Sequence, residues 1–172
     1  MVSGMYEREL RGILSADPDT LKKVTKTCKD EEKEGYMSVE DIPFLVVRAG
    51  GSLGMDLIAI RGEISFPIEV KSSKSGVIYF SDEERLTEQA EWMIDVCTAS
   101  RVLPLYAFRI KGRTGDRWRI FTLDIQGLDK KQSLLQARIP QVEKTVHGNY
   151  KVQWDKGMPL HMLLSYLSHL IG

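Results

Sequence analysis

Runs of apolar residues separated by turn residues predict a β-sheet through the middle of the chain. Three such runs, rich in Ile, Leu, Val and Phe, cover residues 44–48, 55–60 and 64–71. β-Branched and aromatic residues bounded by Gly, Ser or Pro are typical of strands with a buried face. The same signals predict further strands over residues 77–80, 103–110, 118–123 and 148–154. We expect segment 50–71 to lie where this sheet is best packed.

Apolar residues at helical spacing predict helices at both ends of the chain and after the fourth strand. Residues 5–14 carry an apolar stripe of Met5, Leu10, Ile13 and Leu14. The clearest helix follows Ser81-Asp-Glu-Glu84, a capping-box pattern, and a short helix is expected over 128–137. A final helix over 159–171 carries a stripe of Leu160, Leu163, Leu164, Leu167 and Leu170. We interpret this leucine stripe as core, with a dimer interface as the alternative.

Residues 16–41 are more charged and less regular than the rest. Asp17-Pro18 is a helix start signal, since Asp caps a helix and Pro fits its first position. The expected helix runs from about residue 19 to 29 and ends in the acidic cluster 29–34. We interpret 16–41 as an extra helical segment with a solvated face; a partner-binding role is the alternative.

Composition narrows the class of protein. A chain of 172 residues, 42% apolar and 28% charged, is expected to form one globular domain. No apolar run approaches the roughly 20 residues of a membrane span, so we expect no membrane partner. Cys28 and Cys97 lack the spacing of a zinc site, and we expect reduced thiols in a cytoplasmic protein. We likewise expect no signal peptide, because Glu7 and its charged neighbours interrupt any apolar core.

Charge is balanced overall but uneven along the chain. Lys and Arg number 24, as do Asp and Glu, so the formal net charge is zero. Any contact with nucleic acid must therefore rest on a local patch. The strongest candidate surrounds the predicted hairpin turn 111–116 and comprises Arg109, Lys111, Arg113, Arg117 and Arg119.

The candidate chemistry lies in the best-packed strands. Asp56 opens one apolar run, and Glu69 and Lys71 close the next. Side chains alternate across a strand, so Glu69 and Lys71 share one face. If the two runs pair as neighbouring strands, Asp56 comes close to Glu69. Two carboxylates beside one ammonium suggest a divalent-metal site and metal-assisted hydrolysis; the alternative is a buried ion-pair network that fixes the sheet.

Five short motifs follow one another along the chain: YEREL at 6–10, VVRAGGS at 46–52, MDLIAI at 55–60, IEVKSS at 68–73, and IYF followed by EQAE at 88–91. In this order they resemble the motifs of the PD-(D/E)XK nuclease superfamily, and more narrowly those of the archaeal Holliday-junction resolvases. The resemblance implies a restriction-endonuclease-like α/β fold, a mixed β-sheet flanked by α-helices. Residues 1–172 would form a single nuclease domain, with roughly 16–41 as an extra N-terminal helical insertion.

Transferred residue by residue, the resemblance implies that Asp56 and Glu69 bind magnesium, with Glu7 as a third acidic ligand. Manganese is expected to substitute. Lys71 would orient the attacking water or stabilise charge on the phosphate, and Ser52 would lie in a loop that touches the scissile region. These residue types suit the chemistry, because magnesium prefers a few carboxylate oxygens and retains several waters.

The resemblance also implies the substrate and the assembly. The expected DNA-binding residues are Arg48, Ser52, Lys74, Gln89 and Arg113, with Gln89 supporting the site from its helix. The implied function is a magnesium-dependent endonuclease that cuts branched DNA, above all four-way junctions, as a homodimer. The alternatives are a nuclease of the same fold acting on flap, single-stranded or duplex DNA, and a non-catalytic DNA-binding relative.

Overall fold

A six-stranded mixed sheet forms the centre of the molecule. The computed structural model describes residues 2–50 and 54–171, and side chains over 4–50 and 54–170. The sheet order is β1-β2-β3-β5-β6-β9, with bounds β1 (Leu45–Arg48), β2 (Leu57–Arg61), β3 (Ile64–Ser73), β5 (Leu105–Ile110), β6 (Trp118–Thr122) and β9 (Met158–Pro159). A second, three-stranded sheet has the order β4 (Val77–Tyr79), β8 (Tyr150–Gln153) and β7 (Glu143–Lys144).

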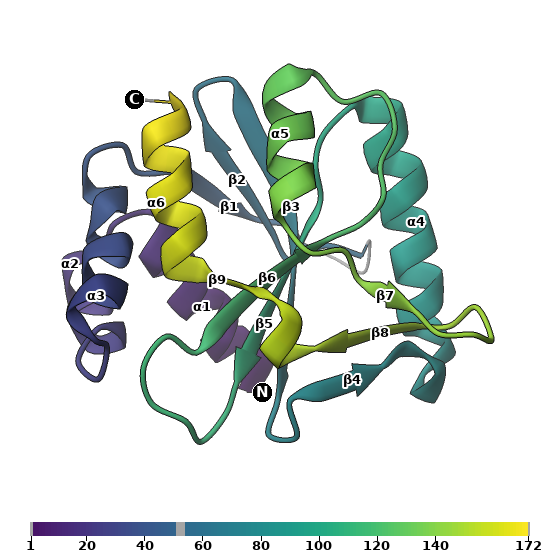
Figure 1. Ribbon diagram of the computed structural model, residues 1–172, viewed down its shortest axis with the longest axis horizontal. Helices are drawn as coiled ribbons and strands as arrows, with labels where there is room; N and C mark the ends of the chain where they lie inside the picture. The colour runs from purple at the N-terminus through teal and green to yellow at the C-terminus, as the bar shows by residue number, and fades with distance from the viewer. Residues whose placement is uncertain (1, 51–53, 172) are drawn as a thin grey trace.

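Helices flank the central sheet on both sides. They are α1 (Val2–Leu14), α2 (Pro18–Val24), α3 (Asp30–Met37), α4 (Glu84–Ser100), α5 (Lys130–Arg138) and α6 (Leu160–Ile171), with short 3-10 turns η1 (Ser38–Glu40), η2 (Phe80–Asp82) and η3 (Trp154–Lys156). In Figure 1, α1, α2, α3 and α6 lie on the left of the sheet, and α4 and the small sheet lie on the right. The predicted fold class, a mixed sheet flanked by helices, is confirmed.

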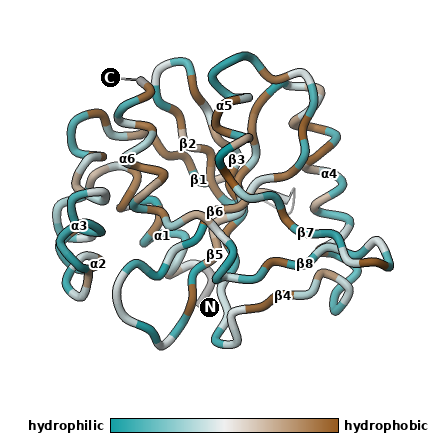
Figure 2. The backbone as a smooth tube through the Cα atoms, viewed as in Figure 1, coloured by the Kyte–Doolittle hydropathy of each residue, from teal (hydrophilic) through white to brown (hydrophobic). Residues whose placement is uncertain are grey.

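Each face of the sheet has its own apolar core. One core joins α1 and α6 to the side chains of β3 that include Phe66 and Ile68. The other joins α4 to Tyr106 and Phe108 of β5. The strongly hydrophobic stretches accordingly follow the central strands, and hydrophilic residues dominate the outer helices α2 and α3 (Figure 2). Burial of these residues supplies most of the driving force for folding.

Strand β3 is an interior strand of the sheet, with a neighbouring strand on each side. It pairs antiparallel with β2 and parallel with β5, which confirms that the two predicted runs are adjacent. Pro67 lies within this strand and is buried. The ladder with β5 begins one residue later, at Ile68, so the missing N–H of Pro67 interrupts no bond of that ladder.

Two details of the predicted helices are wrong. Met5 is 47% exposed and the core position on α1 belongs to Tyr6, at 8%. The capping box at residues 81–84 does not form: Ser81 lies in η2, and Glu83 occupies the N-cap without a side-chain hydrogen bond. Phe80, fully buried, anchors η2 and delays the start of α4.

Residues 16–41 are helical, but they divide differently from the prediction. Asp17 caps α2 as expected, accepting a hydrogen bond from the Thr20 N–H at 2.9 Å. The expected helix over 19–29 stops at Val24, and the acidic cluster begins α3. Tyr36 is 1% exposed and belongs to the core, so the segment is not simply a solvated face. The single domain and the status of 16–41 as an insertion stay predictions.

The leucine stripe of α6 is core, as predicted. Leu160, Leu163, Leu164 and Leu167 are each 2% exposed or less. They pack in the cluster that contains α1 and β3, so these leucines are not available to a second subunit. Within the described residues, no helix is both long and apolar enough to cross a membrane.

Candidate active site

Asp56 is fixed against the middle of β3 by its own backbone and side chain. Its N–H donates to the Ile68 carbonyl at 2.8 Å, directly before β2 begins. Its Oδ2 accepts the N–H of Val70, also at 2.8 Å. A carboxylate that accepts a backbone N–H is held in one orientation. The side chain therefore stays beside Glu69 rather than pointing to solvent.

Glu69 and Lys71 lie on the face of β3 that faces α4. Glu69 is 6% exposed, and its Oε1 lies 3.2 Å from the Lys71 ammonium. Its Oε2 is buried without a hydrogen-bond partner among the described residues. Burial raises the pKa of Glu69 to about 7, against the Lys71 charge that lowers it, and the nearby Asp56 carboxylate raises it further. A buried carboxylate with one unpartnered oxygen and a second carboxylate nearby favours the binding of a cation.

Lys71 is oriented from two sides. Its Nζ contacts Glu69 and donates to Oε1 of Gln89, on α4, at 3.1 Å. A lysine ammonium has three protons to donate. Two partners thus hold the ammonium in place, and its remaining proton has no partner within the described part of the chain.

Glu7 approaches the same site from α1. Its carboxylate forms an ion pair with Arg48 at 3.0 Å, and its side chain is 13% exposed. Burial and the neighbouring Asp56 carboxylate raise the pKa of Glu7. Glu7 is therefore near Asp56, but its charge is shared with Arg48, which the prediction had placed on DNA.

The donor set fits magnesium with two carboxylates. Among the described residues, no group of three or more His, Cys, Asp or Glu side chains is placed to hold a metal ion. Magnesium, however, is usually bound by one or two carboxylates and retains several waters. Asp56 and Glu69, with the unpartnered Oε2, provide that set. The role of Glu7 as a third ligand stays a prediction.

The remaining predicted residues are spread around this centre. Ser52 lies outside the described residues. Lys74 is exposed in the turn between β3 and β4. Arg113 has partners of its own: its guanidinium lies 5.2 Å from the centre of the Trp154 ring and 3.6 Å from the Asp155 carboxylate.

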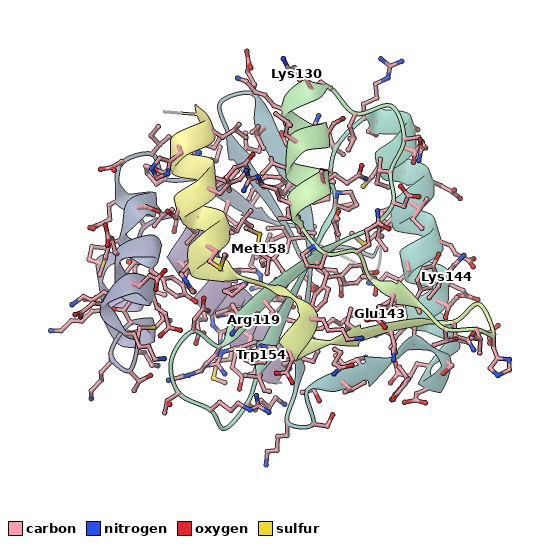
Figure 3. The ribbon with its side chains drawn as sticks, viewed as in Figure 1. Arg119, Lys130, Glu143, Lys144, Trp154 and Met158 are labelled. Atoms are coloured by element: carbon pink, nitrogen blue, oxygen red, sulfur yellow. The ribbon has the colours of Figure 1, made fainter. Side chains whose placement is uncertain are left out.

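The predicted basic patch is smaller than its sequence suggests. Arg109 is buried and its Nε donates to Glu9 at 2.8 Å. Glu9 also accepts the Trp118 indole N–H at 2.9 Å. Arg119 stacks on Trp154 at 3.9 Å, as the labelled side chains in Figure 3 indicate. Of the five residues of the predicted patch, Lys111, Arg113 and Arg117 remain as candidates for DNA contact.

His161 has an acidic partner that the sequence did not reveal. Its Nδ1 lies 2.7 Å from Oδ2 of Asp116, a carboxylate with no exposed surface. Tyr36 donates to the other oxygen of Asp116 at 2.5 Å. Although burial opposes it, hydrogen bonds from His161 and Tyr36 hold the pKa of Asp116 below its usual value. This cluster joins the β5–β6 hairpin to α3 and α6.

Comparison with known proteins decides the family. The family model of the archaeal Holliday junction resolvases (Hjc) matches residues 24–171. The chain belongs to this family. Nuclease activity on Holliday junctions defines this family, and the protein is accordingly a metal-dependent endonuclease. The matched stretch contains Asp56, Glu69, Lys71 and Gln89, whereas Glu7 precedes it.

Similarity to individual proteins is weaker than the match to the family model. No curated protein matches the chain. The solved structure of Hjc from Archaeoglobus fulgidus, a Holliday junction resolvase from an archaeal hyperthermophile, aligns with a TM-score of 0.48 and 18% sequence identity. The alignment covers 70% of this chain and 86% of that chain.

One residue beside the site had no sequence signal. Tyr106 of β5 is the register partner of Glu69 and is fully buried. Its sequence context, an apolar strand, marks it as core. Only the parallel pairing of β3 with β5, which sequence analysis does not provide, places its side chain next to the carboxylate.

Proposed function

We propose that this protein resolves four-way DNA junctions by magnesium-dependent hydrolysis of phosphodiester bonds, acting as a homodimer. The observation that carries the proposal is the convergence of Asp56, Glu69 and Lys71 on one face of β3. Family membership supports the class of substrate. Manganese is expected to replace magnesium, since both prefer oxygen ligands.

The chain's own residues have separate tasks in this reaction. Asp56 and Glu69 hold the ion, which when bound supplies positive charge to the phosphate and lowers the pKa of a coordinated water. Lys71 donates a hydrogen bond from its remaining N–H to a phosphate oxygen and stays positively charged, so that it stabilises the negative charge that develops there in the transition state. Gln89 keeps the Lys71 ammonium from turning away. Glu69 stabilises the same ammonium in its charged form.

DNA contacts rest on local charge, because the chain is neutral overall. Lys74 and Arg113 are exposed, and Lys111 and Arg117 are half-buried. The more phosphates such side chains neutralise, the more steeply the affinity for DNA falls as the salt concentration rises. Four contacts of this kind predict a salt dependence that is modest for a DNA-binding enzyme.

The sheet edge is the surface that suits a second copy. Leu45 and Val47 of β1 are 66% and 48% exposed, and Ile60 of β2, the register partner of Leu45, is 38% exposed. Exposed apolar residues on an edge strand are typical of an interface. A two-fold interface places two active sites on one junction, which allows paired nicks in two strands.

A cleavage assay with matched glutamate variants tests the proposal. Wild type with magnesium should nick a synthetic four-way junction, whereas Glu69→Ala should lose at least about a hundredfold in rate, because an oriented charge near the phosphate is worth several kcal/mol of barrier. Glu63→Ala is the control, since Glu63 is an exposed glutamate in the β2–β3 turn.

Two results would overturn the proposal: an inactive wild type, or a Glu69→Ala variant as fast as Glu63→Ala. Flap and plain duplex substrates, assayed in parallel, separate junction resolution from a nuclease of the same fold with another preference. Equal rates on all three substrates would contradict junction specificity while leaving the hydrolytic chemistry intact.

A further inference from the structure

Tyr106 combines complete burial with an unused hydroxyl. Its residue exposure is 0%, and its ring packs against Phe80 with centroids 5.7 Å apart. The hydroxyl has no hydrogen-bond partner among the described residues. A phenylalanine would fill the same space without burying a polar group, and burying a hydroxyl without a partner is unfavourable. Packing alone therefore does not explain why this position carries a tyrosine rather than a phenylalanine.

A second buried oxygen without a hydrogen-bond partner among the described residues comes from Glu69, on the neighbouring strand. Tyr106 and Glu69 are register partners on the adjacent strands β5 and β3. Residues paired in register point to the same face of a sheet. Oε2 of Glu69 also lacks a partner within the described part of the chain. Burial raises the pKa of Tyr106, and the negative charge of Glu69 raises it further, which agrees with their proximity.

We propose that Tyr106 is a positioning residue whose hydroxyl is linked to Oε2 of Glu69 through one ordered water, since no direct hydrogen bond joins the two atoms. Lys71 already holds Oε1, so Lys71 and this water together fix the plane of the carboxylate. A carboxylate accepts about four hydrogen bonds or ligands, so each oxygen keeps a free lone pair for a cation. The metal-binding part of this inference rests on the proposed function.

Residues that orient a metal ligand have a measurable effect without touching the metal. Their loss typically weakens metal affinity or activity by about 10- to 100-fold. Tyr106→Phe keeps the ring and its contact with Phe80 and removes only the hydroxyl. A purely structural tyrosine would show no loss of metal affinity in this variant.

The first experiment measures manganese binding to the DNA-free protein by calorimetry. Tyr106→Phe should bind Mn²⁺ about tenfold more weakly than wild type, with kcat for junction cleavage reduced by a similar factor and KM unchanged. Tyr150→Phe is the control, because Tyr150 packs on the same Phe80 ring, at 6.0 Å, from strand β8. Wild-type affinity and kcat in Tyr106→Phe would overturn the inference.

The second experiment needs neither metal nor DNA. Urea midpoints are compared in EDTA for wild type, Tyr106→Phe, Glu69→Gln and the double variant, as a double-mutant cycle. Non-additive midpoint shifts support the water-mediated link, and additive shifts overturn it. A wild type that fails to bind Mn²⁺ would instead overturn the proposed function, so the two failures are distinguishable.

Discussion

At the scale of single residues, Glu69 is a buried carboxylate that forms an ion pair with one lysine, Lys71. Charges in apolar strands identify Asp56, Glu69 and Lys71 from the sequence alone, because burial of a charge demands a compensating partner. The sequence does not identify Tyr106 or the Glu9–Arg109 pair. These contacts depend on strand register and on how α1 docks, both of which join residues far apart in the chain.

The pKa of Glu69 predicts how the metal-free protein responds to pH. Its folded-state pKa, about 7, exceeds the ordinary 4.5, so the folded protein binds more protons than the unfolded chain between these values. The free energy of unfolding therefore falls as pH rises through this window, by up to about 3 kcal/mol. Glu69→Gln should accordingly stabilise the protein in EDTA at pH 8 and much less at pH 5.

Urea unfolding at the two pH values checks this effect, with Glu63→Gln as a control on an exposed turn. A Glu69→Gln difference that is the same at both pH values would contradict the raised pKa. Saturating magnesium should reverse the sign at pH 8, since the ion binds the ionised carboxylate and stabilises the folded state by mass action.

At the scale of elements, periodicity identifies helices and strands more reliably than their ends. The leucine stripe of α6 is core as predicted, because four leucines on one face dictate which side packs. The start of α4 is mispredicted, because burial of Phe80 outweighs the local capping signal at residues 81–84. The sequence predicts a helical segment over 16–41 but not the bounds of α3. The packing of α3 depends on Tyr36 and on the close approach of Gly35 to α6.

The hydrogen bonds of Asp116 to Tyr36 and His161 should stabilise the packing of α3 against the β5–β6 hairpin. Tyr36→Phe removes the O–H donor to a buried carboxylate and should lower the free energy of unfolding by about 1–3 kcal/mol. Urea unfolding measures it. Tyr79→Phe, at an exposed tyrosine of β4, should leave the midpoint unchanged. Equal midpoints for both variants would show that the Tyr36 hydroxyl contributes nothing to stability.

At the scale of the whole molecule, the proposed dimer depends on the apolar edge at β1. Leu45→Glu places a charge in the middle of the exposed apolar surface and should convert the dimer to a monomer, because an unpaired charge is costly to bury in an interface. Light scattering coupled to size-exclusion chromatography measures the mass. Met162→Glu, at an exposed residue of α6, should leave the mass unchanged. A wild-type monomer, or a dimeric Leu45→Glu variant, would contradict this interface.

The central claim is that Asp56 and Glu69 bind one divalent ion beside Lys71. Its most direct test is a crystal structure of the protein soaked in manganese, read from the anomalous signal of the ion. We predict one manganese ion coordinated by a carboxylate oxygen from each of Asp56 and Glu69, with waters completing the shell. A crystal soaked to saturation with no ion at this pair, or with the ion bound elsewhere on the chain, would contradict the account.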